Sequence, residues 1–137
     1  MFSSRSKNAI KVLLYLYENQ NKGLVPLKNI ALDEDLSLKY LEHLMPVLID
    51  NDYVSVKRGK DGGYQLKKDG EQINIWDILN LFEVDLYPVS ELSHHQEDKL
   101  GKTLEMWQNF YQLEKDYFVK ITLKEISEKE YVLDFVI

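Results

Sequence analysis

Cysteine is absent from the 137 residues of this sequence. Its absence excludes disulfides, thiolate nucleophiles and iron–sulfur clusters held by cysteine. Long apolar runs are missing as well, since no stretch approaches the roughly 20 residues that a membrane-spanning helix needs. The first residues lack an apolar core followed by a small-residue cleavage site, so they do not look like a signal peptide. We expect a cytoplasmic protein without a membrane partner.

Basic residues are in the minority. The chain carries 17 Lys and Arg against 23 Asp and Glu, a formal net charge of −6. Taken alone, this balance argues against a nucleic-acid partner. The imbalance lies in the second half, however, because residues 1–70 hold 11 Lys and Arg against 9 Asp and Glu, whereas residues 71–137 hold 6 against 14. The first half can therefore carry a basic face, while the negative charge of the second half argues against contact with phosphates.

Hydrophobic periodicity predicts a mainly α-helical chain with one small β-hairpin. Helices are expected over 7–19, 27–35 and 37–51, the third capped by Ser37 and, because of Pro46, kinked or ended early near Met45. Strands over 53–58 and 63–66 flank the hairpin signal GKDG, and Asn74 is expected to cap a fourth helix. With a very short extended segment at 24–26, this order is that of a winged helix-turn-helix domain.

The second half is predicted to consist of a polar loop at 84–97 and a long helix over about 98–121, with Thr122 capping a short final helix. The third helix is expected to bury Leu38 together with the apolar residues that follow it at helical spacing. The long helix has two apolar stripes, whereas a helix that packs only on its own domain needs one. We therefore expect it to form a dimer. The predicted dimer contacts are Leu100, Leu104, Trp107, Phe110, Tyr111, Leu113, Tyr117 and Phe118.

A winged helix-turn-helix domain places its third helix in the major groove and its hairpin on the DNA backbone or in the minor groove. Outward side chains of that helix can read base edges or hold phosphates, and an arginine at a glycine-rich tip suits a narrow minor groove. The alternatives are a solvated helix face and an ordinary exposed hairpin. The candidate DNA-binding residues are Ser3, Arg5, Lys7, Lys28, Ser37, Lys39, Tyr40, Glu42, His43, Lys57, Arg58, Gly59 and Lys60.

Short motifs extend over nearly the whole chain. The most specific are YLEHL at 40–44 and RGKDGGYQL at 58–66, and they are accompanied by FSSR at 2–5, LKNIA at 27–31, IWDIL at 75–79, Trp107 and TLKEI at 122–126. Together they resemble the signature of the Rrf2 family of winged-helix transcription regulators. The resemblance implies a DNA-binding domain at 1–83, a loop at 84–97 and a dimerisation helix with a C-terminal tail at 98–137. It also implies a dimeric repressor or activator that binds a palindromic operator in double-stranded DNA.

The resemblance also bears on cofactors and partners. Many family members hold an iron–sulfur cluster with three cysteines before the long helix, and this chain has none, so no cofactor is expected. The cysteine-free type that represses cysteine metabolism also ends in an aromatic-rich tail with a final isoleucine. This chain ends in Asp134, Phe135, Val136 and Ile137, which is similar to the peptide that serine acetyltransferases insert into cysteine synthase. We therefore expect a regulator of sulfur or cysteine metabolism with cysteine synthase as a candidate partner; alternatively, the tail packs on the dimer as a strand.

Other classes of function have less support. The chain has three histidines, and none lies in a nucleophile motif, so we expect no enzyme. The adjacent His94 and His95 lie among carboxylates that could help to bind a metal, but no further ligand follows at a suitable spacing, and we expect no metal site. A winged-helix adaptor that binds proteins rather than DNA is the main alternative.

Overall fold

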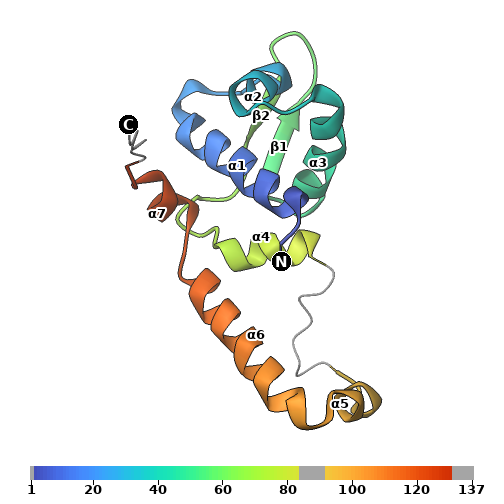
Figure 1. The fold of residues 1–137 in the computed structure, drawn as a ribbon. Coiled ribbons are helices and arrows are strands. Elements are labelled where there is room, and N and C mark those ends of the chain that lie inside the picture. The colour runs from blue at the N-terminus through green and yellow to red at the C-terminus, as the bar shows by residue number, and fades with distance from the viewer. Residues whose placement is uncertain (1, 84–91, 131–137) are drawn as a thin grey trace, which may run out of the picture.

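The computed structural model describes residues 2–83 and 92–130, which form mostly helices around one antiparallel hairpin (Figure 1). The helices are α1 (Ser4–Glu18), α2 (Leu27–Glu34), α3 (Leu38–Asp50), α4 (Ile75–Phe82), α5 (His94–Leu100), α6 (Leu104–Val119) and α7 (Leu123–Ser127), and the strands are β1 (Val54–Lys57) and β2 (Gly63–Leu66). The prediction of a winged helix-turn-helix with a further C-terminal helix is confirmed. No helix in the described part of the chain is long and apolar enough to cross a membrane.

The core forms where α1 meets the hairpin, α2, α4 and α7 (Figure 1). Its buried side chains follow helical spacing on each element, as expected for amphipathic helices. They are Ala9, Val12, Leu13 and Leu16 of α1, Ile30 of α2, Leu41, Leu44, Met45 and Leu48 of α3, and Ile75, Ile78 and Leu79 of α4. This core fixes the position of α3 against the hairpin.

Side-chain caps define where the helices begin. The hydroxyl of Ser37 accepts from the Tyr40 N–H, the amide oxygen of Asn74 accepts from Asp77, and Thr122 caps α7 through Glu125, as predicted. Each such cap contributes about 1 kcal/mol. The expected early end near Met45 was wrong, because α3 continues through Pro46 to Asp50. Pro46 is exposed, so water can satisfy the carbonyl that has no N–H partner one turn earlier.

Polar contacts from α1 hold the turn between α2 and α3. The Lys11 ammonium donates to the Glu34 carbonyl at the end of α2 (3.2 Å), and the Tyr15 hydroxyl donates to the Asp33 carboxylate (2.6 Å). That hydrogen bond, with burial and the nearby carboxylates, raises the pKa of Tyr15 to about 12. Asp35 ends α2 in the left-handed conformation at φ 53°. The turn is therefore fixed both by its own backbone and by α1.

The wing is attached to the domain by a third, single-residue strand. Val25 and Tyr64 exchange two backbone hydrogen bonds of 2.8 Å, which confirms the predicted extended segment at 24–26. The approach is so close that a Cβ on Gly63 would lie 2.7 Å from the Val25 carbonyl oxygen. Only glycine fits here, which explains the second glycine of the GGY motif.

The predicted loop and long helix differ from the structure in one respect. His94, His95 and the residues up to Leu100 form α5, so the assignment of residues up to 97 to a loop was wrong. A capping box between Ser93 and Gln96 starts α5, and the predicted continuous helix is broken at Gly101, which has φ 54°. Glycine adopts this conformation without the steric cost that side chains meet. The long helix is therefore α6 alone.

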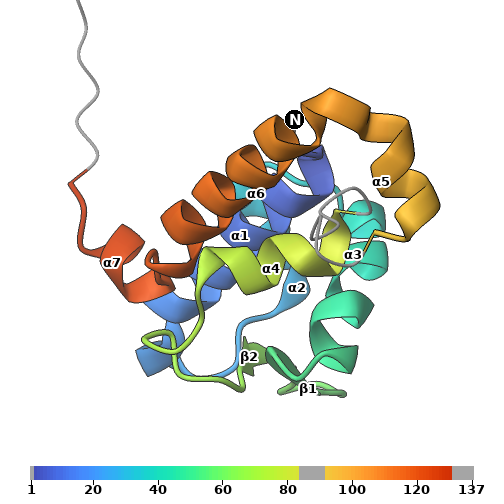
Figure 2. The same ribbon diagram turned by 90° about the horizontal axis from the view of Figure 1, so that it is seen from below.

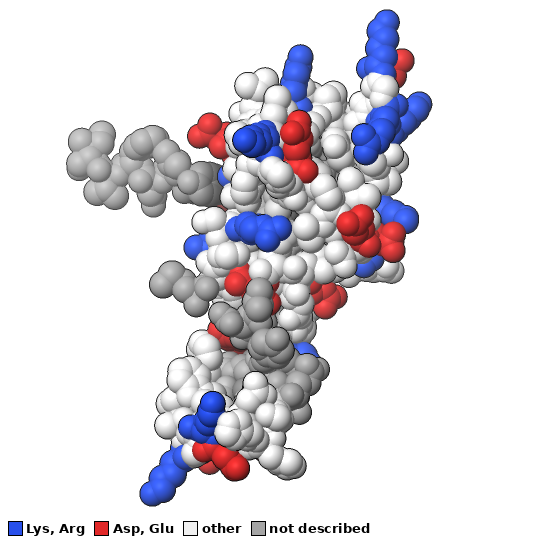
Figure 3. All heavy atoms as spheres, turned by 90° about the vertical axis from the view of Figure 1, so that its right-hand side faces the viewer, with Lys and Arg blue, Asp and Glu red and all other residues white. Residues whose placement is uncertain are grey.

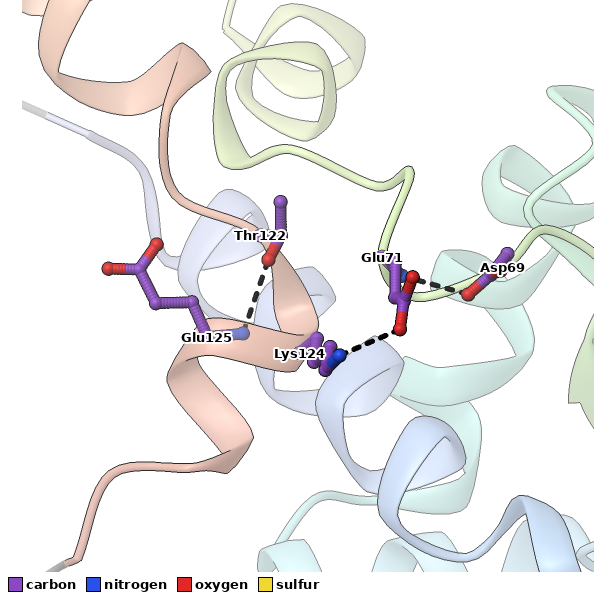
Figure 4. Close-up of polar contacts among 5 residues, drawn as sticks. All are labelled: Asp69, Glu71, Thr122, Lys124 and Glu125. Atoms are coloured by element: carbon purple, nitrogen blue, oxygen red, sulfur yellow. Dashed lines mark hydrogen bonds and ion pairs between the residues drawn. The ribbon is translucent and has the colours of Figure 1, made fainter.

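The chain returns to the winged domain at α7 (Figure 4). Leu123 is fully buried, and its N–H donates to the Ile73 carbonyl (3.1 Å). The Lys124 ammonium lies 2.8 Å from the Glu71 carboxylate in the loop before α4 (Figure 4), and this ion pair raises the pKa of Lys124. These contacts fix the C-terminal end of α6, while its N-terminal end extends away from the hairpin (Figure 1).

Candidate nucleic-acid interface and dimer face

Helix α3 presents an exposed face opposite its buried one. Lys39, Glu42 and His43 are exposed, as predicted, and Tyr40 is half-buried at the edge of that face. The prediction that Leu38 is buried was wrong, because its side chain is 48% exposed. Leu44, one turn before Leu48, is buried instead. The exposed set combines a cation, an acceptor, an imidazole and an apolar side chain, which are the groups that contact phosphates, base edges and thymine methyls.

The wing carries the most concentrated positive charge. Lys57, Arg58, Gly59 and Lys60 are all exposed, and none of the three cations pairs with a carboxylate in the described residues. Gly59 has φ 109°, a conformation that suits glycine. Basic side chains project from the top of the face in Figure 3, the end at which Figure 1 shows the wing, with some acidic side chains among them. The unpaired cations are available to phosphates.

The hairpin and α3 form one rigid unit. Helix α3 packs against β1, and the Tyr53 N–H at the start of the hairpin donates to the Leu48 carbonyl (2.9 Å). In Figure 1 the two elements lie side by side at the same side of the domain. A ligand that contacts the outer face of α3 therefore meets the wing in a fixed geometry.

The residues predicted at the start of the chain have different environments. Ser3 caps α1 and its N–H donates to the Glu83 carboxylate (2.6 Å), so it has a structural role. Burial opposes ionisation of Glu83, but hydrogen bonds from Ser6 and Ser3 outweigh it and lower the pKa of Glu83. The Arg5 guanidinium lies 5.4 Å from the centre of the Phe82 ring, where it gains a cation–π contact. Lys7 on α1 and Lys28 on α2 are exposed, and Ser37 acts as the α3 cap.

The sequence pattern did not predict that Leu38 and Asn8 belong to this face. Leu38 was assigned to the core because its spacing fits either side of the helix. Asn8 was not singled out, although its amide nitrogen donates to the Tyr40 hydroxyl (3.2 Å) across 32 residues of sequence. No local signal in the sequence could have found that contact.

Helix α6 buries none of its side chains in the single chain. The structure divides the predicted dimer contacts into three groups. Tyr111 packs edge-on against Trp76, with ring centres 5.5 Å apart, and Phe118 packs against Phe2 at 5.4 Å, so these two face the chain's own domain, alongside which α6 runs (Figure 2). Leu100 and Leu104 are half-buried. The predicted contacts Trp107, Phe110, Leu113 and Tyr117 are exposed, and Met106 is exposed beside them.

An apolar face of this size on one helix is typical of a protein–protein contact surface. The geometry thus combines a candidate DNA-reading unit with a helix whose outer apolar face is exposed in the described part of the chain. Comparison with known proteins identifies the family of the chain. A family model described as Rrf2, iron-dependent transcriptional regulator, matches residues 2–129. The chain belongs to the Rrf2 family.

Known Rrf2 proteins extend this match. The chain is 30% identical over 134 residues to the HTH-type transcriptional regulator IscR of Cronobacter sakazakii, covering 96% of this chain and 83% of that one. Its fold is similar to the global cysteine regulator CymR of B. subtilis, with a TM-score of 0.76, 26% identity and coverage of 93% and 95%. It is also similar to IscR of T. potens, with a TM-score of 0.73, 26% identity and coverage of 92% and 85%.

Membership of the Rrf2 family establishes the class of function. The chain is a DNA-binding transcription regulator, and the prediction that it is not an enzyme is confirmed by the family. The family description names iron, but this chain has no cysteine to hold an iron–sulfur cluster. Within residues 2–83 and 92–130, no group of three or more His, Asp or Glu side chains is placed to bind a metal ion. His94 instead lies 3.6 Å from the Glu97 carboxylate on α5. The side chains of the described residues therefore do not form a metal centre.

Proposed function

We propose that the chain is a homodimeric repressor that binds a palindromic operator, with α3 in the major groove and the wing on the adjacent backbone. The observation that carries this proposal is the packing of α3, with its exposed face, against a basic wing whose cations have no carboxylate partner among the described residues. A dimer through α6 would present this pair twice. Two-fold symmetric proteins of this type read half-sites about one helical turn, roughly 34 Å, apart.

Salt dependence and one wing variant test the DNA contact. Arg58→Ala removes an exposed cation from the wing tip of both protomers. Loss of a DNA-contacting arginine costs about 1–3 kcal/mol, so we expect operator affinity to fall at least about fivefold. The slope of log affinity against log salt should become shallower by about one for each phosphate that the variant no longer neutralises. Fluorescence anisotropy with the promoter of its own operon at several salt concentrations measures both quantities.

The control is Lys99→Ala, which removes the same charge from an exposed position on α5, far from the wing in Figure 1. It should leave both affinity and slope nearly unchanged. A wild-type protein that binds promoter DNA with no salt dependence, or an Arg58→Ala variant equal to wild type, would contradict the proposal. Those results would favour the adaptor alternative, in which the winged domain binds only proteins.

We further propose that its target genes belong to sulfur or cysteine metabolism. The similarity to the B. subtilis global cysteine regulator and the absence of any cysteine support this choice over an iron–sulfur response. The tail residues Asp134, Phe135, Val136 and Ile137, which suggested cysteine synthase as a partner, lie outside the described residues. That partner stays a prediction based on the sequence of the tail.

Deletion of Val136 and Ile137 tests the partner. If the tail enters the amino-acid site of cysteine synthase, the deletion removes the terminal apolar residue and carboxylate and should abolish complex formation. Sedimentation of the mixed purified proteins measures this, and unchanged operator binding by the truncated chain controls for folding. A complex of equal strength without the two residues would eliminate the tail as the contact.

A further inference from the structure

Helix α1 is joined to α2 and α3 by a row of polar contacts at residues 8, 11 and 15, which lie on one helix face because they are three or four residues apart. Lys11 and Tyr15 hold the end of α2. Asn8 is the member nearest the start of α1, and its contact reaches α3 itself: its Nδ2 donates to the Tyr40 hydroxyl oxygen (3.2 Å). The row thus ends on a residue at the edge of the proposed DNA-reading face.

Tyr40 is held at three points. Its backbone N–H donates to the Ser37 hydroxyl (3.0 Å), its half-buried ring packs against the core, and its hydroxyl accepts from Asn8. A tyrosine hydroxyl can accept hydrogen bonds and also donate one. The Asn8 amide occupies an acceptor position, and no described residue accepts the remaining proton of Tyr40. The hydroxyl is therefore set to donate to a ligand outside the chain.

We infer that Asn8 is a positioning residue that orients the Tyr40 hydroxyl as a donor to a phosphate oxygen of DNA. This inference rests on the proposed function. Phosphate oxygens are pure acceptors, whereas base edges mix donors and acceptors. Tyr40 is half-buried at the edge of the α3 face beside α1, whereas Lys39 and His43 are exposed. Side chains at such an edge meet the backbone that borders the groove.

A double-mutant cycle tests the coupling. Tyr40→Phe removes only the hydroxyl, and loss of a hydrogen bond to a charged phosphate should weaken binding about tenfold. Asn8→Ala should weaken it by roughly fivefold, because the hydroxyl remains but is no longer oriented. The double variant should bind no more weakly than Tyr40→Phe alone. Anisotropy titrations on operator DNA give all four affinities, and thermal melting of each variant controls for folding.

Asn8→Asp tests the direction of the hydrogen bond with a nearly isosteric side chain. A carboxylate only accepts, so it would take the Tyr40 proton away from DNA as well as adding a repulsive charge. The loss should therefore be larger when Tyr40 is present than in the Tyr40→Phe background, where only the charge acts. Equal losses in the two backgrounds would overturn the assigned direction.

Two further measurements separate a phosphate contact from other roles. Tyr40→Phe is a neutral change, so affinity for operator and for unrelated duplex should fall by the same factor with an unchanged salt slope. A loss confined to the operator would overturn the phosphate assignment in favour of a base contact. Equal effects of Asn8→Ala with and without the Tyr40 hydroxyl would overturn the positioning role. Failure of the wild type to bind any duplex would instead contradict the proposed function.

Discussion

Replacement of Phe110 and Leu113 by glutamate is expected to leave the protein monomeric and to weaken operator binding roughly 100-fold to 10,000-fold. The two side chains are 51% and 68% exposed in the single chain, on a helix that buries none of its residues. Two carboxylates per protomer within an apolar contact would have to lose their hydration without a partner. A monomer offers one half-site at a time, so it loses the avidity that links two half-sites, a factor of about 10²–10⁴.

Sedimentation at micromolar concentration and operator titrations measure the two parts of this result. Gln108→Glu is the matched control, because it adds one carboxylate to the same helix at an exposed position two residues from Phe110, on the opposite side. That variant should remain a dimer with wild-type affinity, and helix content should be equal in all three proteins. A dimer that survives both glutamates would place the subunit contact elsewhere on the chain.

The order of elements could be predicted from the sequence because its signals are local. Ser37, Asn74 and Thr122 cap helices through hydrogen bonds that span three residues, and each cap lies where it was predicted. The hairpin could be predicted as well, because its turn glycines and its two strands occupy one short segment of the sequence. Local signals of this kind are sufficient for a winged helix-turn-helix, in which sequential elements are neighbours.

The misassigned residues depended on context that the local pattern does not contain. Leu38 and Leu44 both fit the helical spacing of Leu41 and Leu48, and only packing against α1 and β1 decides which of them is buried. The break at Gly101 had a signal in the sequence, but an isolated glycine in a helical pattern is often tolerated. Its positive φ shows that this glycine ends a helix.

One part of the candidate site could likewise be predicted from the sequence and another part could not. The basic wing could be found from the sequence because Lys57, Arg58 and Lys60 are close together along the chain and have no carboxylate partners among the described residues. The bond between Asn8 and Tyr40 could not, because it joins residues on different helices. The same holds for the close approach of Val25 to Gly63, which is visible in the sequence only as a glycine.

Gly63→Ala is expected to destabilise the fold by about 3 kcal/mol and to lower the Tm by roughly 10 °C. The new Cβ would lie 2.7 Å from the carbonyl oxygen and 2.8 Å from the carbonyl carbon of Val25. Backbone atoms cannot rotate away as a side chain can, so the two 2.8 Å hydrogen bonds between Val25 and Tyr64 must lengthen or break. Thermal melting followed by circular dichroism measures the loss of stability.

The same change should weaken operator binding, because it displaces β2 from Val25, and β2 pairs with β1, whose end and following turn carry the wing cations. Gly59→Ala is the matched control: its Cβ would meet nothing within 4 Å, and only the φ of 109° opposes it. That strain costs about 1 kcal/mol, so the control should lose about a third of the stability lost by Gly63→Ala. Equal losses at the two glycines would show that backbone conformation, and not the approach of Val25, explains the glycines of the wing. A larger loss at Gly63, in both Tm and affinity, would show that the single-residue strand at Val25 sets the angle at which the wing meets DNA.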